Sequence, residues 1–441
     1  MSEYKDSGVD FLGKIPASWS TTRLKYCLSE PMKYGASESG VEYDENLCRY
    51  IRITDITADG ELKDEGKLSL TDKQAAGYRL RDKTVLFARS GGTVGKSFMY
   101  KKEHGPAAFA GYLISAVADE NVMLPEWLLY YTNSWAYQEW VGQIFTQATI
   151  QNIGADKYSN MPIVLAPVDE QRRILSFLDG KCETVNALIS DIQKEIDLLE
   201  TYKKSVITEA VTRGIDKQVE LMDCDIEWLE KIPAHWHVKP FRYVLNERNE
   251  KNNPPQTDER LSLSIGLGVT TYDEKTTNLD RFKEDVSLYK LAHVGDLVMN
   301  SMNMIVGATG VSNYFGCVSP AYYTFYDNEN DHIMAKYCEY LFLTPLLMGE
   351  LHKLGKGIMF IERGEGKVNT CRLKVSRYDL GHLLLPVPPV DEVRKIVTYL
   401  DKVTHDIERV IEEKREQLST LEVYRKDFVY EYITGKKSVI S

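Results

Sequence analysis

The sequence has no apolar run approaching the roughly 20 residues that cross a bilayer, and its start has no basic segment followed by an apolar one. We therefore expect no membrane-spanning helix and no secretory signal. Its seven cysteines, at positions 27, 48, 182, 224, 317, 338 and 371, are odd in number and never spaced Cys-x-x-Cys. This pattern argues against a disulfide framework or a metal cluster and is typical of reduced, buried thiols in a cytoplasmic protein.

An overall basic charge is also lacking. The net charge of −11 argues at first against nucleic acid as a partner, but a local basic face matters more than the sum. Much of the acid lies in two segments expected to be helical, around Glu195 and Glu412. Basic residues gather in one part of the first third of the chain: Arg49, Arg52, Arg79, Arg81, Lys83, Arg89, Lys96, Lys101 and Lys102. A basic surface is therefore compatible with this acidic chain.

Two segments occur twice. The segment around Ile-Pro-Ala-Ser-Trp19 returns as Ile-Pro-Ala-His-Trp236, with identical residues 217 positions apart (233 − 16 for the prolines). Residues 167–179, Pro-Val-Asp-Glu-Gln-Arg-Arg-Ile-Leu-Ser-Phe-Leu-Asp, return as residues 389–401 at a spacing of 222. A period this long indicates a duplicated domain rather than a short-repeat solenoid.

A long helical pattern follows each copy of the second segment. Apolar residues recur at every seventh position, first at Leu178, Val185, Ile192, Leu199 and Val206, with Leu188, Ile189, Ile196 and Tyr202 between them, and then at Ile396, Val403, Val410 and Tyr424. This spacing is typical of a coiled-coil seam. About 45 residues at 1.5 Å each give a rod of roughly 65–70 Å. We favour an antiparallel pair formed within the chain over helices that only dock on their own modules.

The sequence between these helices predicts two modules. Strands are expected at Tyr50–Ile56, Thr84–Ala88, Leu261–Ile265, Asp296–Asn300 and Ala321–Phe325, and helices at Pro125–Val141 and near Ala335–Phe342. The predicted fold class is α+β, with two mixed modules separated by two long helices in an internal pseudo-two-fold repeat. The expected parts are a first module (residues 1–166), a helix (167–215), a second module (216–388) and a second helix (389–441).

Two segments resemble catalytic motifs, but each lacks a residue that the motif requires. Gly91-Gly-Thr-Val-Gly-Lys-Ser97 resembles a phosphate-binding loop, but Ser90 stands where its first glycine is required and no helix pattern follows. Asn253-Pro-Pro-Gln256 resembles the Asn-Pro-Pro-aromatic motif of adenine methyltransferases without its base-stacking ring. A Pro-rich surface loop is the better interpretation of that segment.

Carboxylates near the helix starts are not convincing nuclease residues. Asp169 and Asp391 are better explained as acids favoured by the helix dipole, and Glu170 and Glu392 follow them directly. The histidines are isolated and form neither a triad nor a metal cluster. We therefore expect no catalytic site and no bound metal in this chain.

The sequence resembles the DNA-specificity subunit of type I restriction-modification enzymes over essentially its whole length. The resemblance rests on Tyr4–Trp19 with its later copy, and on the Pro-x-x-Glu-Gln-Arg-x-Ile-x-x-Phe-Leu-Asp start of the first helix. It also rests on the segments Arg89–Gly95, Thr149–Ile153, Gly295–Asn300 and Val318–Tyr322. One departure, Val393 in place of the second glutamine, is expected to be minor.

The resemblance implies a noncatalytic subunit in which each module is a target-recognition domain for one half of a bipartite site in double-stranded DNA. The two helices then act as a ruler between the half-sites. The implied partners are two methyltransferase (modification) subunits, which bind S-adenosylmethionine and methylate adenine. Restriction subunits that translocate DNA with ATP and Mg²⁺ are also implied. The resemblance further implies a prokaryotic cytoplasmic, nucleoid-associated protein.

Within the modules we expect DNA contacts from side chains able to bridge guanine, adenine or phosphate. The first-module candidates are Arg52, Arg89, Ser90, Thr93, Lys96, Gln147, Thr149, Gln151 and Asn152. The second-module candidates are Asn300, Ser301, Asn303, Tyr322, Lys353, Lys356 and Arg363.

Two other functions are alternatives. A fused enzyme that methylates or cuts DNA itself would require the intact motifs that are missing here. A protein-interaction adaptor with two unrelated ligand domains on a coiled coil would show no DNA affinity with any partner present.

Overall fold

The computed structural model describes residues 3–57, 60–146, 152–272, 285–327, 332–358, 362–363, 367–368 and 372–439. The chain divides into two compact units. Unit 1 comprises Met1–Gln193 and Arg415–Ser441, and unit 2 comprises Lys194–Lys414. Each unit therefore contains one module together with part of both long helices.

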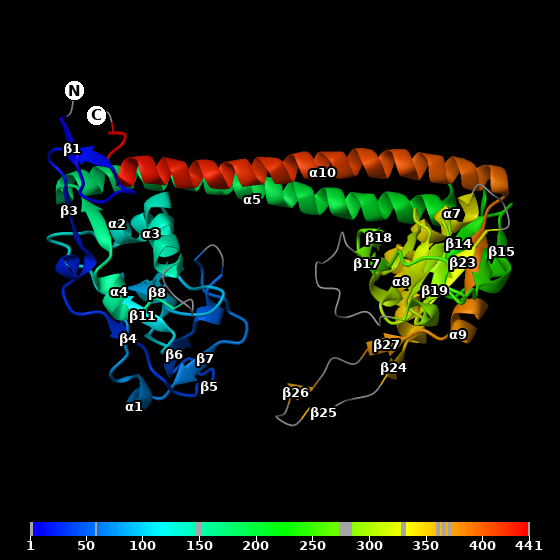
Figure 1. Ribbon diagram of the computed structural model, residues 1–441, viewed down its shortest axis with the longest axis horizontal. Coiled ribbons are helices and arrows are strands. Elements are labelled where there is room, and N and C mark those ends of the chain that lie inside the picture. The colour runs from blue at the N-terminus through cyan, green and yellow to red at the C-terminus, as the bar shows by residue number, and fades with distance from the viewer. Residues whose placement is uncertain are drawn as a thin grey trace. The chain divides into compact units, whose positions relative to one another are not determined.

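Unit 1 contains small sheets and short helices ahead of the first long helix (Figure 1). Its strands are β1 (Tyr4–Asp6), β2 (Lys14–Pro16), β3 (Ser20–Arg23), β4 (Lys33–Tyr34), β5 (Val41–Glu42), β6 (Cys48–Ile51), β7 (Leu68–Leu70), β8 (Val85–Ala88), β9 (Ser97–Met99), β10 (Ala107–Phe109), β11 (Leu113–Ala116) and β12 (Pro162–Leu165). Its short helices are α1 (Asp72–Ala75), α2 (Pro125–Thr132), α3 (Trp135–Thr146) and α4 (Ala155–Ser159).

Unit 2 has the same kinds of element in nearly the same order. Its strands are β13 (Leu221–Ile226), β14 (Leu229–Pro233), β15 (His237–Pro240), β16 (Asn246–Arg248), β17 (Leu261–Ser264), β18 (Gly268–Thr271), β19 (Lys290–Ala292), β20 (Leu297–Asn300), β21 (Thr309–Val311), β22 (Gly316–Val318), β23 (Tyr322–Tyr326), β24 (Lys356–Ile358), β25 (Glu362–Arg363), β26 (Lys367–Val368), β27 (Arg372–Lys374) and β28 (Leu384–Val387). Its short helices are α7 (Ile333–Phe342), α8 (Pro345–Leu354) and α9 (Arg377–His382).

The duplication is visible in the sheet topology. A four-stranded sheet has the order β4-β11-β8-β9 in unit 1 and β16-β23-β20-β21 in unit 2, with antiparallel neighbours throughout. A two-stranded pair closes each module, β3 with β12 and β15 with β28. The predicted α+β class with an internal repeat is therefore confirmed.

The two long helices, α5 (Val168–Arg213) and α10 (Val390–Ile433), each contribute to both units. The start of α5 packs in the core of unit 1 through Leu175 and Leu178, and its end packs in the core of unit 2 through Val211. Conversely, α10 begins in the core of unit 2 with Leu400 and ends in that of unit 1 with Ile433. Each helix thus joins the apolar cores of both units.

The helices run side by side in opposite directions within each unit (Figure 1). In unit 1 the ring of Phe177 lies 5.7 Å from that of Phe428 and 4.9 Å from that of Tyr432. In unit 2 Lys203 forms an ion pair with Glu408 at 2.5 Å. These contacts establish the predicted antiparallel pairing in addition to the docking of each helix on the modules.

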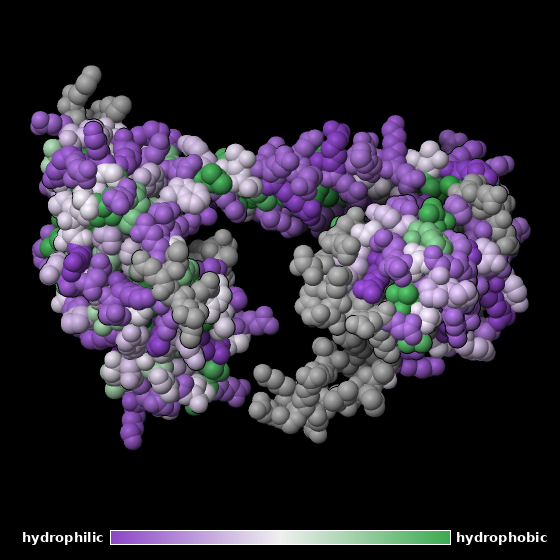
Figure 2. Space-filling model, viewed as in Figure 1, coloured by the Kyte–Doolittle hydropathy of each residue, from purple (hydrophilic) through white to green (hydrophobic). Residues whose placement is uncertain are grey.

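Most positions of the predicted seam are buried or half-buried, including Leu178, Val185 and Ile396. Three residues assigned to it are exposed instead: Leu188 (49 %), Tyr202 (56 %) and Tyr424 (53 %). The seven-residue stride drifts relative to the 3.6-residue helix period, so these positions lie at its margin. Figure 2 shows a mostly hydrophilic face over the long helices, with only isolated apolar residues.

Each copy of the Ile-Pro-Ala-x-Trp segment contacts the end of a long helix. The first copy contacts the residue after α10, and the second copy contacts the residue after α5. Gly435, just after α10, has φ +73°, and a Cβ there would lie 2.4 Å from Pro16 and 3.0 Å from Trp19. Gly214, just after α5, has φ +77°, and its Cβ would lie 3.4 Å from Trp236. The left-handed conformation favours glycine at both positions, and at Gly435 the close approach to Pro16 also requires it.

Four of the five predicted strands match the observed elements, whereas the strand expected over Tyr50–Ile56 is wrong after Ile51. There a short 3-10 helix covers Ile53–Asp55, because the Asp55 carboxylate accepts from the Arg52 amide and turns the chain. One predicted helix also differs. The helix expected over Pro125–Val141 is two helices, because α2 ends at Thr132 and α3 begins at Trp135. At the junction the Ser134 hydroxyl donates to the Tyr131 carbonyl at 2.7 Å, a side-chain bond that competes with continuation of the helix. No helix among the described residues is long and apolar enough to cross a membrane.

Candidate nucleic-acid interface

In unit 1 a cluster of exposed and polar residues lies where strands β4, β8 and β11 meet. Arg89 follows β8, and its guanidinium lies 5.0 Å from the centroid of the Tyr34 ring. Its Nη1 donates to the carbonyl oxygen of Gly111 at 3.4 Å. Tyr112, beside Gly111, is 65 % exposed. The cluster therefore offers a cation and two aromatic rings.

Two sequence segments with predicted DNA contacts meet at this cluster. Ser90 forms a β-bridge with Asn152, and the amide of Ile153 donates to the carbonyl oxygen of Arg89 at 2.9 Å. The Tyr34 hydroxyl accepts from the Ala155 amide at 2.9 Å, which ties the same segment to β4. The structure thus brings Arg89, Ser90 and Asn152 together across about sixty residues of chain.

Polar atoms of this cluster lack a partner within the described residues. They are Arg89 Nε and Asn152 Oδ1, both buried at the atomic level. An unsatisfied buried polar group costs about 1–3 kcal/mol, so the module itself does not satisfy the polar groups of this cluster. Arginine and asparagine are the side chains that bridge guanine and adenine in the major groove.

The other described first-module candidates differ in position. Arg52 is held by its own module, because it forms hydrogen bonds of 3.1 and 2.7 Å with the buried Asp55 carboxylate and one of 2.7 Å with the Gly66 carbonyl. Thr93 is half-buried in the turn after Arg89, and Lys96 is exposed at the end of that turn. Gln147, Thr149 and Gln151 lie outside the described residues.

The basic patch expected in the first module is largely neutralised. Lys83 is paired with Glu126 at 2.8 Å, Arg79 with Asp72 at 2.5 Å and Arg81 with Glu30 at 3.7 Å. The hydrogen bond and charge of Lys33, with a smaller contribution from Arg81, hold the pKa of Glu30 below its usual value despite some burial. These cations mainly balance local acids.

In unit 2 the corresponding turn follows β20. The Val375 amide donates to the Ser301 carbonyl at 3.0 Å, as the Ile153 amide does to Arg89. Ser301 is fully buried and Asn300 is 9 % exposed, its side-chain oxygen accepting from the Met302 amide. Ser301, expected as a DNA contact, is therefore a core residue here. Asn303 is exposed in the same turn.

The second-module cations have acidic partners. Lys353 is paired with Glu350 at 2.8 Å and Lys356 with Asp379 at 3.2 Å. The side chain of Arg363 lies outside the described residues, and Tyr322 is half-buried at the start of β23. Of the second-module candidates with described side chains, Asn303 is the exposed residue that lies in the turn after β20.

Sequence reasoning missed several residues of these surfaces. Tyr34 lies 55 positions from Arg89 (89 − 34) and carries no local motif. Lys374, exposed at the end of β27, occupies the position equivalent to Asn152 at the repeat spacing of 222 (374 − 152). That spacing was a usable signal for Lys374, whereas no signal was available for Tyr34.

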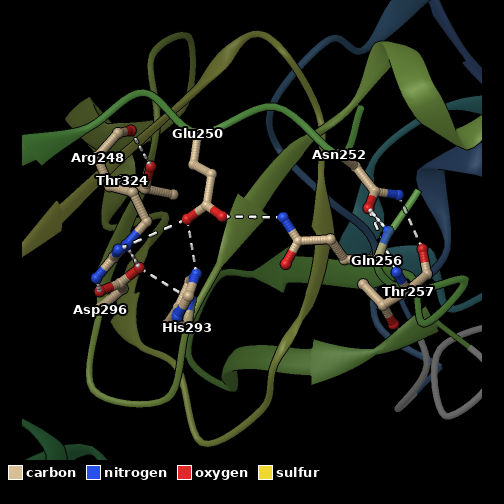
Figure 3. Close-up of polar contacts among 8 residues, drawn as sticks. All are labelled: Arg248, Glu250, Asn252, Gln256, Thr257, His293, Asp296 and Thr324. Atoms are coloured by element: carbon tan, nitrogen blue, oxygen red, sulfur yellow. Dashed lines mark hydrogen bonds and ion pairs between the residues drawn. The ribbon is translucent and has the colours of Figure 1, made fainter. Parts of the chain in front are cut away.

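A charged network supports the second module (Figure 3). Arg248 binds the buried Asp296 carboxylate through hydrogen bonds of 2.6 and 3.1 Å. Glu250 accepts from Gln256 at 3.1 Å and lies 2.9 Å from the ring Nε2 of His293. The network joins the extension of β16 to the turn before β20.

The same network explains the methyltransferase-like segment. Asn252, fully buried, donates to the Thr257 carbonyl at 2.8 Å and accepts from the Gln256 amide at 2.7 Å (Figure 3). These bonds close the Asn-Pro-Pro-Gln loop on itself. The segment is therefore a structural loop, as expected.

The phosphate-loop-like segment is also structural. Within it the Val94 amide donates to the Gly91 carbonyl at 3.1 Å, and the Lys96 amide donates to the Thr93 carbonyl at 3.0 Å. Strand β9, rather than a helix, begins at Ser97. The described residues also contain no group of three histidine, cysteine or acidic side chains placed to hold a metal.

Two modules of one topology, joined by two antiparallel helices shared between them, define a duplicated two-module protein with equivalent loop surfaces. No protein-family model matches the chain. It is 23 % identical over 448 aligned residues to a protein of Methanocaldococcus jannaschii described as the type I restriction enzyme MjaX specificity subunit, covering 96 % of this chain and 95 % of that protein. The MjaVIII specificity subunit of the same organism is 24 % identical over 245 residues, 54 % of this chain and 52 % of that one.

A solved structure gives the same result for the fold. A chain from a type I restriction-modification system superposes with a TM-score of 0.66 at 16 % identity, over 96 % of this chain and 99 % of that one. The resemblance to type I restriction enzyme specificity subunits, stated from the sequence motifs, is confirmed along nearly the whole length.

Proposed function

We propose that this chain is the noncatalytic, sequence-specific DNA-binding subunit of a type I restriction-modification enzyme. Each module reads one half of a bipartite, gapped site in double-stranded DNA. The observation that carries the proposal is the equivalence of the two loop surfaces. The turns after β8 and β20 each receive a main-chain hydrogen bond from a distant segment, to the carbonyls of Arg89 and Ser301.

The side chains on these equivalent surfaces differ. The first module presents Arg89, Ser90 and Asn152, whereas the second presents Asn303 and Lys374. Since base edges are distinguished by the donors and acceptors placed against them, the two modules read different half-sites. The target is therefore an asymmetric sequence with a gap.

The long helices set the gap in this proposal. Each of them is built into the cores of both units, so its length constrains the distance between the readers. One heptad adds about 10 Å of helix, or about three base pairs at roughly 3.4 Å each.

The catalytic steps belong to partners. Two modification subunits, which carry S-adenosylmethionine, methylate one adenine in each half-site, and restriction subunits using ATP and Mg²⁺ translocate and cut unmodified DNA. The complex acts on the nucleoid in the cytoplasm of a prokaryotic cell. The absence of an intact catalytic motif in the sequence supports a recognition role for this chain.

The first experiment is genome-wide mapping of N6-methyladenine in the host with and without this gene. Loss of one bipartite, gapped methylation motif on deletion supports the proposal and identifies both half-sites. Retention of every motif, with no modification subunit recovered by pull-down, supports the two-ligand adaptor instead.

Two variants then separate the parts of the proposal. Inserting one heptad after Ile192 and another after Lys414 should lengthen the gap by about three base pairs and leave both half-sites unchanged. Exchanging residues 30–160 for those of another specificity subunit should alter one half-site alone. An unchanged gap would contradict the ruler, and a change in both half-sites would contradict independent reading.

A further inference from the structure

A polar groove lies in unit 1 between the first module and the last third of α10. It consists of two adjoining hollows of about 310 and 430 Å³, which share the lining residues Gly60, Ser97, Asn133, Gln138, Arg425 and Lys426. Lys101 lines one hollow and Lys96 the other. With Glu61 and Glu422, the described lining holds four cations and two carboxylates.

The groove is continuous with the candidate interface of the first module. The turn that begins at Arg89 and Ser90 ends at Val94, Gly95 and Lys96, which line one hollow. The Tyr137 hydroxyl donates to the Gly95 carbonyl at 2.6 Å and holds the turn against α3. One side of this turn therefore faces the Arg89 cluster, and its end faces α10.

The two helix cations of the groove have no carboxylate partner among the described residues. Arg425 Nη1 donates to the neutral side-chain oxygen of Asn186 at 2.6 Å. The Lys426 ammonium lies 5.6 Å from the centroid of the Trp135 ring. Both side chains are half-buried, so their charges are held at the groove wall rather than extended into solvent.

The repeat supplies an internal comparison. At the spacing of 222, Arg425 is equivalent to Lys203 (425 − 203) and Asn186 to Glu408 (408 − 186). In unit 2 this contact is a lysine–glutamate ion pair, whereas in unit 1 an asparagine replaces the glutamate. The same contact is thus neutralised in unit 2 and leaves a positive charge in unit 1.

We infer that this groove binds the sugar-phosphate backbone of the DNA duplex beside the half-site read by the first module, with Arg425 and Lys426 contacting phosphates. The inference rests on the proposed function and deepens it, because it assigns a spacer helix a DNA contact. Phosphate contacts orient a reader without specifying sequence, and each adds to the salt dependence of binding. Lys203, the unit 2 equivalent of Arg425, makes no such contribution, because Glu408 already balances its charge.

The test uses the full chain assembled with the modification subunits of its system and a DNA duplex containing the mapped site. Binding is measured between about 50 and 200 mM salt. The plot of log K against log salt falls with a slope of about −0.9 for each phosphate contact. Each lost contact therefore lowers the magnitude of the slope by about 0.9, and this magnitude is the slope compared among the variants. Arg425→Gln and Lys426→Gln should each lower the slope by about that amount, and the double variant by about twice it. The methylated motif should stay the same.

Two further variants separate charge from folding. Asn186→Glu copies the unit 2 arrangement and should lower the slope without removing a cation, whereas Arg425→Lys should preserve it. The controls are Lys181→Gln, which removes an exposed cation of α5 outside the groove lining, and Glu408→Asn in unit 2. Neither control should lower the slope.

Three outcomes would overturn the inference. An unchanged slope in the Arg425→Gln, Lys426→Gln double variant excludes phosphate contacts in the groove. Loss of modification subunits from that variant on gel filtration shows that the groove binds an acidic protein surface instead. If the wild-type complex shows no sequence-specific binding, the proposed function itself fails, whereas intact wild-type binding with unaltered variants contradicts only the groove.

Discussion

The hydroxyl of Tyr130 on α2 donates a hydrogen bond of 2.7 Å to the carboxylate of Asp179 on α5. The second copy repeats the arrangement, with Tyr340 on α7 donating to Asp401 on α10 at 2.6 Å. Burial, together with the bond to Asp179, raises the pKa of Tyr130, so its hydroxyl remains a donor at all ordinary pH values. Each module is thereby tied to the start of the helix that follows it.

Tyr130→Phe should therefore destabilise unit 1 and Tyr340→Phe unit 2. Removal of one such bond should lower the free energy of unfolding by about 1–2 kcal/mol, which lowers Tm by a few degrees, roughly 2–4 °C per kcal/mol for units of this size. Calorimetry of the full chain measures the change. Tyr26→Phe, at a residue 66 % exposed, is the matched control, and an equal loss there would contradict a specific role for Tyr130.

A second prediction concerns the two different helix starts. Gln171 accepts from the Leu124 amide at 3.0 Å and donates to the carbonyls of Val122 and Ala166 at 3.0 and 2.8 Å. The equivalent Val393 is fully buried among apolar residues. Val393, the departure from the family pattern expected to be minor, therefore replaces three polar contacts by apolar packing.

Neither residue should be tolerated at the other's place. Gln171→Val leaves three main-chain groups without their partner, and Val393→Gln buries an amide in an apolar core. Each change should cost about 2–4 kcal/mol in the free energy of unfolding. Urea titration followed by far-ultraviolet circular dichroism measures this cost. A loss below about 0.5 kcal/mol in either variant, the range of ordinary surface substitutions, would show that the two helix starts are interchangeable.

A third prediction concerns Arg89, whose guanidinium is held by the Tyr34 ring and the Gly111 carbonyl. Arg89→Lys keeps the charge and loses the planar fork that bridges a guanine. Recognition of the first half-site should weaken by about 1–3 kcal/mol, or roughly fivefold to 150-fold. Methylation of duplexes with substituted half-sites measures the effect.

The control for Arg89 is Arg52, which binds the buried Asp55 within its own module. Arg52→Lys should reduce stability and leave the recognised sequence unchanged. If the Arg52 variant alters the first half-site as strongly as the Arg89 variant does, the assignment of the Arg89 cluster as the reader is wrong.

The residues that sequence reasoning placed well share one property: their pattern is local or repeated. The long helices follow from the seven-residue stride of their apolar residues. The pairing of the two helices then follows from their exposed seams.

Contacts between distant segments were much less accessible. Nothing around Ser301 in the sequence marks it as buried, and its carbonyl is bound by the Val375 amide, which lies 74 residues later (375 − 301). The pairing of Arg52 with Asp55 is local, three residues apart, but composition alone does not show that this carboxylate neutralises the cation. The division of the chain into four parts, and the DNA-contacting residues themselves, stay predictions.

The last prediction concerns the acid stability of the second module. Burial alone would raise the pKa of Glu250, but hydrogen bonds from Gln256 and His293, with the charges of His293 and Arg248, hold it below its usual value. A carboxyl group with a lowered folded-state pKa stabilises the fold above its unfolded pKa, near 4.3. That contribution is lost as the pH falls through the folded-state value.

Unit 2 should therefore lose stability faster than a Glu250→Gln variant does as the pH falls from about 5 to about 3. The variant retains a hydrogen-bond acceptor but cannot bind a proton in this range, so its Tm should depend less on pH. Calorimetry at intervals across this range measures the difference. A second variant, Asp285→Asn, removes an exposed carboxyl group whose pKa is lowered by hydrogen bonds from Ser287. Its dependence of Tm on pH is compared with that of the Glu250→Gln variant. Parallel curves for the wild type and Glu250→Gln would show that the network of Figure 3 does not contribute to acid stability.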